Sequence, residues 1–532
     1  MHRQFKKKVA RFAWRFYRLG RYLTEILIWS RIFVVRRTSA NIAISEKLRV
    51  KKQVRYPQPE LRISGRTGAE HFEHGFNIVF DILFANLRKP NHLVPIRHAL
   101  PGPAFAGVYL WDSAFIAQVW RHWDRNVAFD VLDSVLRLRD GDKLQHVVAD
   151  FGRSPFTQPP LIAWSLARIC TEEQEAGRCE YSHFTILKAY HQWLNTHRKL
   201  PGGLYFWMHP YESGLDNSPR FSSCDEKVIS DTRMLAAPDL SAYMVMQCEA
   251  LAKLAEIFGE QATVREYELE AQQIRQLINE QLWHEDDGLY YDRNLQTGDF
   301  IRSRTIAALI PLAAGVPNRS QAERLRETVR DASAFGSPIP FPSVALNDAD
   351  FRKDMWSGPV WVNTAYLVLT GLQRYDFFEE YRTLAWRLCD GVFRVLRQEH
   401  QIYEFYDPEC FHTHELRRKK GNLWKAIILG TRPQKDFVGW TGLVNNLVIE
   451  SLFGLGVDDD NVILKPGFPA EAAGLRFHLK LPQVNGYVDL TVLPDGCYQG
   501  EIAIKGISER FELCKGDKMR LPVLAAEKSA CQ

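Results

Sequence analysis

A long succession of helical segments is the feature that most limits how this chain can fold. Between about residues 68 and 457, apolar side chains recur at helical spacing in roughly twelve segments separated by loops rich in Gly, Pro and Asp. The predicted helices lie near 69–88, 112–122, 125–138, 160–171, 182–196, 238–257, 262–283, 301–313, 318–330, 358–374, 377–397 and 438–454. This succession favours a toroid of six inner and six outer helices. A stack of tetratricopeptide-type repeats is the rival, although no fixed period supports it.

The pattern changes after "GLGVDDDN", where short alternating segments bounded by turns replace the helices. Examples are "LRFHLKLP" and "GYVDLTVL", which are typical of strands in a small antiparallel module. The sequence therefore predicts four parts. They are a basic segment at 1–37, a linker at 38–67, the helical toroid at 68–457, and a C-terminal β module with its tail at 458–532.

The charge of the chain is unevenly distributed. The formal net charge is +5, but residues 1–55 hold 16 Lys and Arg against Glu25 and Glu46. The remaining chain carries 52 basic and 61 acidic residues, so the body is acidic. An acidic body gives no support to nucleic-acid binding, and we expect no nucleic-acid partner.

The first 37 residues resemble a cationic amphipathic helix. Apolar residues such as Phe5 and Val9 recur at helical spacing with Lys and Arg between them, which suits an anionic membrane surface. Glu25 and Arg31 interrupt the apolar stretch, so it is too short to span a bilayer, and no signal-peptide pattern is present. We expect a cytoplasmic protein, with peripheral membrane attachment as one hypothesis. A solvated arm, or a helix docked on the acidic body, is the alternative.

The cysteine pattern predicts reduced thiols. Nine Cys are scattered singly, without a CxxC, which argues against a disulfide framework and against structural zinc. His412 and His414 form an HxH pair, but no further ligands of suitable spacing stand nearby. We therefore expect neither a metal nor a cofactor.

Several stretches place an aromatic residue beside a carboxylate or amide and next to Gly or Pro. They are 109–115, 157–164, 213–221, 355–363, 402–408 and 436–442. Any one of them alone is better explained by a helix cap and a core Trp. If the helices form a toroid, however, these loops could converge on one end of it. An aromatic-walled pocket with carboxylates suits a polyhydroxylated ring, so we expect a carbohydrate ligand.

Four strings, "SGLDNSPRF", "WSGPVWVN", "EFYDP" and "GWTG", occur in an order that resembles glycoside hydrolase family 63 and its relatives. These include processing α-glucosidases and bacterial mannosylglycerate and glucosylglycerate hydrolases. The "YLWDSAF" string also resembles trehalases of the same clan. The resemblance covers roughly 105–455. It implies an all-α (α/α)6 barrel, inversion at the anomeric carbon and no catalytic metal.

The resemblance also implies roles for individual residues. Asp216 corresponds to the general acid and Glu404 to the general base of an inverting α-glycosidase, which needs one protonated and one ionised carboxyl. An aromatic, poorly hydrated site and the negative charge of Asp112 would keep Asp216 protonated. The substrate-binding candidates are Trp111, Asp112, Gln158, Arg220, Trp356, Trp361, Asn363 and Trp440. Glu212 and Asp407 are better explained as local turn partners.

Two departures from the family pattern lie near the expected pocket. Ser357 stands where the family usually has the Arg of W-R-G-P, and a longer, basic insertion at 409–435 precedes the Gly-Trp. These two departures mean that the resemblance does not identify the substrate, and they are compatible with reduced or altered activity. The alternatives are therefore a trehalase-like member of the clan and a catalytically weak sugar-binding or membrane-attached scaffold protein.

Overall fold

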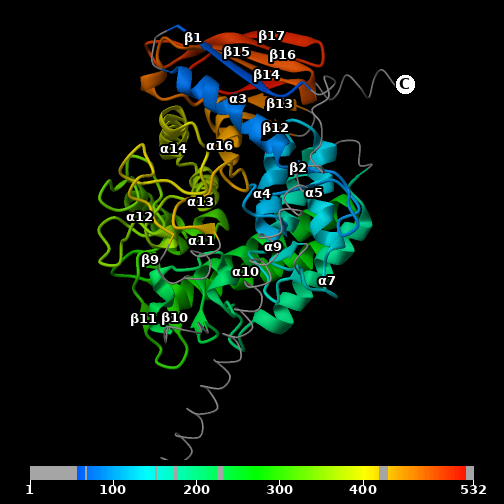
Figure 1. Ribbon diagram of the computed structural model, residues 1–532, viewed down its shortest axis with the longest axis vertical. Coiled ribbons are helices and arrows are strands. Elements are labelled where there is room, and N and C mark those ends of the chain that lie inside the picture. The colour runs from blue at the N-terminus through cyan, green and yellow to red at the C-terminus, as the bar shows by residue number, and fades with distance from the viewer. Residues whose placement is uncertain are drawn as a thin grey trace, which may run out of the picture.

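A computed structural model describes residues 57–65, 69–149, 152–172, 178–224, 232–418, 429–458 and 461–522. The predicted basic segment at 1–37 and most of the predicted linker lie outside this range. No helix in the described part of the chain is long and apolar enough to cross a membrane. The described chain consists of a helical body and, at one end of it, strands from the C-terminal region (Figure 1).

The C-terminal strands form two antiparallel sheets. They are β12 (Leu455–Asp458), β13 (Asn461–Leu464), β14 (Arg476–Leu481), β15 (Gly486–Val492), β16 (Tyr498–Ile504), β17 (Ile507–Leu513) and β18 (Met519–Leu521). One sheet has the order β12-β13-β18, and the other is five-stranded with the order β1-β14-β15-β16-β17. The first of these strands, β12, begins three residues before 458, where the sequence pattern changes from helices to strands.

Strand β1 (Glu60–Ser64) lies within the range predicted as linker. It pairs antiparallel with β14, with Leu61 opposite Leu479. Helix α3 (Glu70–Ala85) fastens β1 to the body, because the Asn77 side chain bonds both the N–H and the carbonyl of Leu61, at 3.1 and 3.0 Å. The pattern of this segment is too short to predict a strand alone, and its partner is far away in the sequence.

The helical body follows the predicted succession of helices. Its long helices are α3, α4 (Leu110–Trp120), α5 (Arg125–Arg137), α6 (Ile162–Glu172), α7 (Tyr181–Arg198), α9 (Pro238–Ile257), α10 (Gln261–Leu282), α12 (Arg319–Arg330), α13 (Val362–Arg374) and α14 (Phe378–Glu399). Shorter elements are α8 (Pro210–Ser213), α11 (Ile310–Ala313), which follows a 3₁₀ turn over Ile306–Leu309, and α16 (Leu443–Asn446), which continues into a π-helix over Leu447–Leu452. Small two- and three-stranded sheets occupy the loops.

Two of the predicted helices are shorter than expected. The segment 301–313 is helical only from Ile306, since β11 (Phe300–Ile301) opens it. The segment 438–454 becomes helical at Leu443, because its first residues form the loop that carries Trp440. In both segments the helical periodicity is present, but the first residues form a strand in one and a loop in the other.

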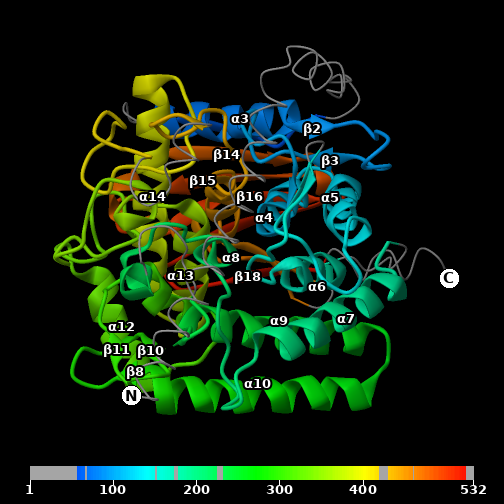
Figure 2. The same cartoon turned by 60° about the horizontal axis from the view of Figure 1, so that its bottom comes forward.

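Burial alternates along the succession of helices. Every residue of α4 is buried, whereas α10 buries only Tyr267, Ala271, Ile274, Ile278 and Leu282, a single stripe at helical spacing. A helix that is buried on all sides lies inside a fold, and a striped helix lies at its surface. Helix α9 packs against α10 and is almost wholly buried, and the two run side by side at the edge of the body opposite α3 (Figure 2).

The buried helices contact one another in a closed order. Helix α4 packs on α6, α6 on α9, α9 on α11, α11 on α13, α13 on α16, and α16 returns to α4. Helices α5, α7, α10, α14 and α3 each pack on at least one of these buried helices. This order places the first turns of α4 and α13, which carry candidate site residues, within one ring of helices.

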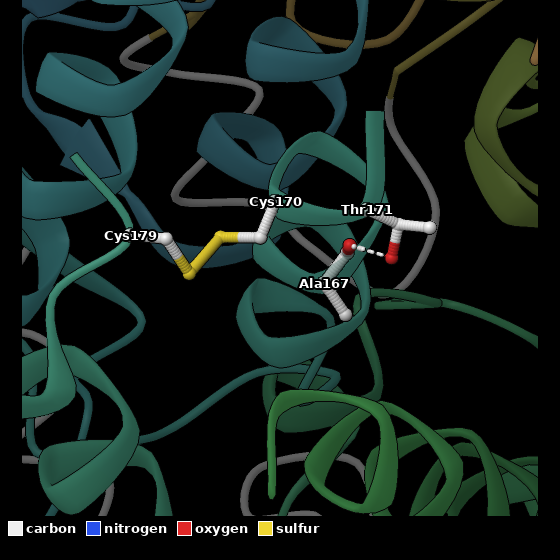
Figure 3. The surroundings of a disulfide bond; sticks show 4 residues. All are labelled: Ala167, Cys170, Thr171 and Cys179. Carbon is white, nitrogen blue, oxygen red and sulfur yellow. Dashed lines mark hydrogen bonds between the residues drawn. A yellow bond between two sulfur atoms is a disulfide. The ribbon is translucent and has the colours of Figure 1, made fainter. Parts of the chain in front are cut away.

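A disulfide joins Cys170 and Cys179, at the end of α6 and just before α7 (Figure 3). The Cα atoms are 5.8 Å apart, within the range that this bond requires. The prediction of reduced thiols is therefore wrong for this pair. The sequence separation of nine residues forms no recognisable disulfide pattern, and only the return of the chain after α6 brings the two residues together.

Candidate active site

All six aromatic and carboxylate-bearing stretches reach one small cavity of ≈ 50 Å³. Its wall consists of Phe105, Tyr109, Trp111, Asp112, His146, Gln158, Gly214, Asp216, Met355, Trp356, Trp361, Glu404, Arg418, Phe437 and Trp440. The loops converge as the sequence predicts, and Asp216 and Glu404 are in the same wall. The roles assigned to these residues remain predictions.

Four tryptophans form the aromatic wall of this cavity. Trp356 and Trp361 stack with ring centroids 3.8 Å apart and planes within 6°. Trp440 meets Trp111 at 5.7 Å and Trp361 at 5.5 Å. All four side chains are buried, so their positions are fixed by packing against one another. An aromatic wall of this kind suits the apolar C–H side of a sugar ring.

Two glycines permit the close approach of chain segments around this wall. Gly214 ends α8 in the left-handed conformation, with φ 73°, and a Cβ atom there would collide with the Trp111 ring. A Cβ atom at Gly439 would lie 2.6 Å from Oδ1 of Asp112. Asp112 itself lies in the first turn of α4, where the helix dipole favours a negative charge.

The loop that carries Asp216 is held by its neighbour Asn217. The Asn217 side chain donates to the carbonyl of Asp354 at 3.1 Å and accepts from the N–H of Trp356 at 2.8 Å. The Ser357 hydroxyl donates to the Asn217 carbonyl at 2.8 Å. Ser357, the residue that departs from the family pattern, therefore clamps the loop of the candidate acid to the loop of Trp356.

Glu404 is 1% exposed and is positioned through its backbone. Its N–H donates to the carbonyl of Gln434 at 3.1 Å. Its own carbonyl accepts from the indole N–H of Trp440 at 2.7 Å. One wall tryptophan thus joins the "GWTG" loop to the "EFYDP" loop of the candidate base, although Trp440 follows Glu404 by 36 positions.

Arg418 also lines the cavity and was not among the predicted site residues. It belongs to the insertion at 409–435, and its guanidinium contacts the Glu404 carboxylate with both side chains at most 2% exposed. Burial lowers the pKa of Arg418 to about 10, against the opposing effect of Asp216 and Asp354. The group is still protonated at neutral pH. A basic insertion in the sequence indicated positive charge near the pocket but could not show which side chain enters it.

Two of the predicted substrate-binding residues do not line the cavity. Arg220 is fully buried and pairs with Asp239 at 2.6 Å and Asp292 at 3.3 Å. Asn363 is fully buried in the first turn of α13, and its side chain has no hydrogen-bond partner among the described residues. Arg220 lies away from the cavity because a buried guanidinium needs nearby carboxylates, and Asp239 and Asp292 supply them within the helical body.

The carboxylates of Glu212 and Asp407, which the sequence suggests are local turn partners, form buried ion pairs. Glu212 is completely buried and forms an ion pair with Arg198 at 2.6 Å. Asp407 is also completely buried, and Lys353 lies 3.0 Å from its carboxylate. Neither residue lines the cavity. Phe105 and His146 line it without having been predicted, and no local pattern in the sequence distinguishes them.

Among the described residues, one group of side chains has the geometry to hold a metal ion. His191, Cys248 and Glu270 bring their ligand atoms within 4.8 Å of one another. Burial raises the pKa of the Cys248 thiol well above its usual value, so the thiol form is favoured. Glu270 is already bonded by His191 at 2.9 Å and Lys199 at 3.2 Å. The group is therefore best described as a satisfied ion-pair network, because a metal would require the thiolate.

The helical fold has counterparts among solved structures. The structure of the GH63 mannosylglycerate hydrolase from Thermus thermophilus in complex with glucose superposes with a TM-score of 0.57, covering 69% of this chain and 98% of that one at 22% identity. At that identity the likeness shows the six-hairpin glycosidase fold. A cavity with two carboxyls and a tryptophan wall in such a fold fits one class of protein, the glycoside hydrolases.

The sequence comparisons narrow that class to a family. The model of the mannosylglycerate hydrolase MGH1-like glycoside hydrolase domain matches residues 106–410, more than half of the chain. This chain belongs to that family. A mannosylglycerate hydrolase of a Thermus thermophilus strain is 26% identical over 395 residues, which cover 60% of this chain and 92% of that protein. A periplasmic trehalase of Escherichia coli is 22% identical over 478 residues, covering 77% of this chain and 78% of that protein.

Proposed function

We propose that the protein is an inverting α-glycoside hydrolase that acts on an α-linked glucoside or mannoside. The observation that carries the proposal is the meeting of Asp216 and Glu404 in one cavity walled by four tryptophans. The two carboxyls come from separate loops, and each loop is fixed by its own hydrogen bonds. An inverting glycosidase needs two carboxyls held independently, with room for water beside one of them.

In the proposed reaction Asp216 is the general acid. Its protonated carboxyl gives a proton to the oxygen of the leaving group as the glycosidic bond breaks. Glu404 is the general base, and its carboxylate takes a proton from the water that attacks the anomeric carbon from the opposite face. The contact with Arg418 favours the ionised form of Glu404, which is the form that a base requires.

We also propose that residues 68–457 form an (α/α)6 barrel and residues 458–532 a β module with its tail, whose larger sheet also includes β1. The closed order of contacts among α4, α6, α9, α11, α13 and α16 supports six inner helices. The striped burial of helices such as α10 and α12 supports an outer layer. In this arrangement the N-terminal ends of inner helices surround the active site.

The substrate is expected to have an α-glycosidic bond and a small sugar at the nonreducing end. The relatives named mannosylglycerate hydrolase make glycosylglycerates the first substrates to test. The cavity of ≈ 50 Å³ is below the about 300–1,000 Å³ of typical ligand pockets, so substrate entry requires a shift of side chains such as Arg418. A trehalase-like activity is the runner-up, supported by the "YLWDSAF" string.

The purified protein is expected to release the β-anomer from an α-glycoside, since water attacks directly and no covalent intermediate forms. The screen should contain α-glucosides and α-mannosides, including glycosylglycerates, glucose-capped oligosaccharides and trehalose, with the first-formed anomer read by NMR. A first-formed α-anomer would contradict inversion. Trehalose as the preferred substrate would favour the runner-up.

A catalytically weak sugar-binding or scaffold protein is the alternative from another class. Ser357 in place of the family's Arg, together with the insertion that brings Arg418 against Glu404, motivates it. Sugar binding without hydrolysis of any compound in the screen would support this alternative. The presence of both Asp216 and Glu404 favours the enzyme, because a binder has no need of an acid and a base.

Residues 1–37 are further proposed to bind an anionic membrane surface. Deleting them should lower binding to phosphatidylserine-containing vesicles, since each Lys or Arg near such a surface contributes about 1 kcal/mol. Sedimentation of the full and shortened proteins with anionic and neutral vesicles measures this. A full-length variant with Lys6, Lys7, Arg11 and Arg15 changed to Gln separates charge from the apolar stripe. Equal binding by the full and shortened proteins would remove the proposal.

A further inference from the structure

A second and larger cavity, of ≈ 430 Å³, lies between the helical body and the C-terminal strands. Its wall includes the residues that follow α4, the start of α14, the end of the π-helix after α16, and parts of β12 and β13. Its volume is within the range of pockets that hold small organic ligands, about 300–1,000 Å³. Boundaries between structural units are a common location for such pockets.

The wall of this cavity is strongly basic. Its charged residues are Arg121, Arg125, Arg168, Arg382 and Lys465, with Glu450 as the single carboxylate, and His122 is also present. The overall composition does not explain such an excess, because the chain beyond residue 55 contains more acidic than basic residues. A concave surface lined by one sign of charge attracts ligands of the opposite sign.

Glu450 is already occupied by its neighbours. It contacts Arg121, lies 3.1 Å from both Arg168 and His122, and accepts from the Tyr366 hydroxyl at 2.9 Å. Burial would raise the pKa of Glu450, but Arg121 and Arg168 outweigh it and hold the pKa well below its usual value. The negative charge of Glu450 therefore offsets the positive charges of Arg121 and Arg168. It does not offset those of the other basic residues in the wall.

Arg382 and Lys465 line the same cavity. Arg382 donates to the carbonyl of Lys465 at 3.3 Å, and its guanidinium lies so close to Gly467 that a Cβ atom there would collide with it. The Lys465 ammonium lies 3.7 Å from the centre of the Phe378 ring. Both side chains are basic, and neither forms an ion pair with a described residue.

The surrounding acids do not compensate this pair directly. Glu379 pairs with Lys515, and Asp376 acts on Lys465 only at a distance. Burial, followed by repulsion from Arg382, lowers the pKa of Lys465. Keeping two like charges adjacent and partly buried is unfavourable unless a counter-ion shares the site. Arg125, whose buried Nε has no hydrogen-bond partner among the described residues, adds a third basic group to the same wall.

This cavity is distinct from the catalytic pocket. Trp111 and Asp112, at the first turn of α4, line the catalytic pocket, whereas Arg121 follows the last residue of that helix. The 11 residues of α4 therefore separate the two by about 16 Å. Helix α13 separates the two cavities in the same way. Trp361 at its start lines the catalytic pocket, and Gln373 near its end lines the basic cavity.

We propose that this cavity binds a small phosphorylated organic molecule, of about the size of a hexose phosphate. The phosphate would be held by Arg382 and Lys465, which supply charge-assisted N–H donors. Phe378 and Ile463 provide apolar wall for the organic part. The proposed binding site does not depend on the glycosidase reaction, so the two proposals can be tested independently.

Calorimetric titration of the full-length protein with glucose 6-phosphate, inorganic phosphate and glucose tests the proposal. Glucose 6-phosphate should bind saturably and more weakly at higher ionic strength. Lys465→Gln and Arg382→Gln should each lower its affinity roughly 10-fold or more. Arg510→Gln, at a side chain 90% exposed on β17, should leave the affinity unchanged. Glucose shows how much binding the catalytic pocket contributes.

Three results would overturn the proposal. The first is the absence of saturable glucose 6-phosphate binding, and the second is equal affinity in the wild-type protein and both cavity variants. The third is equal affinity for inorganic phosphate and glucose 6-phosphate, which would remove the organic part of the ligand. Thermal melting of each variant in the absence of ligand establishes that it is folded. If one of the two cavity variants does not fold, the other alone is enough for the test.

Discussion

Asp216→Asn should lower kcat/KM on an α-glycoside with a sugar or glycerate leaving group by about 10²–10⁴-fold, the usual contribution of general acid–base catalysis. The amide has nearly the shape of the carboxyl but has no acidic proton to give to the leaving oxygen. The loop should keep its position, because Asn217 and Ser357 hold it through bonds that do not involve the Asp216 side chain.

The nature of the leaving group separates the acid from the base. A glycosyl fluoride needs little help from an acid, so Asp216→Asn should lose much less activity on the fluoride than on the natural glycoside. Glu404→Gln removes the group that activates water, and both substrates need that group. Its loss should therefore be similar on the two substrates.

The exposed residue Asp299, in the turn between β10 (Asp292–Asn294) and β11, provides the matched control. Asp299→Asn makes the same chemical change at a residue outside the cavity wall and should leave both rates unchanged. Full activity of Asp216→Asn and Glu404→Gln on a natural glycoside would show that these residues do not have the proposed roles. An equal loss on both substrates for Asp216→Asn would argue against its role as acid.

The sequence could predict the features that depend on local periodicity or on short strings. Helix α9 begins at Pro238, a residue favoured in the first turn, and α12 begins with a capping box between Asn318 and Gln321. Both helices follow closely from the sequence. The loops of the cavity were predictable for a different reason, since each joins an aromatic residue to a polar one beside Gly or Pro.

Features that depend on distant partners could not be predicted in this way. Strand β1 is defined by its pairing with β14, and the Cys170–Cys179 bond by the return of the chain after α6. Arg220 has the composition of a site residue, but only the fold shows that Asp239 and Asp292 surround it. All three side chains are buried, and this burial raises the pKa of Asp292 although Arg220 opposes the shift.

A role for Arg418 follows only when the sequence and the structure are considered together. The family pattern has an Arg in the position of Ser357. In this chain Arg418, which belongs to the insertion, contacts Glu404. The match to the family model ends at residue 410, before Arg418. A cation in contact with a buried carboxylate favours the ionised form, so Arg418 is expected to keep the candidate base active at lower pH.

Arg418→Met should therefore move the acidic limb of the kcat/KM profile to higher pH by about 1–3 units, because a nearby opposite charge shifts a carboxyl by that amount. The sign follows from the loss of the cation: Glu404 is then protonated over a wider pH range and cannot accept a proton from water. Arg418→Lys keeps the charge and should retain most of the original profile. Arg417→Met, at the exposed neighbouring residue, is the matched control. Thermal melting at each pH establishes that the variants are folded, and an unchanged acidic limb in Arg418→Met would show that Arg418 does not act through Glu404.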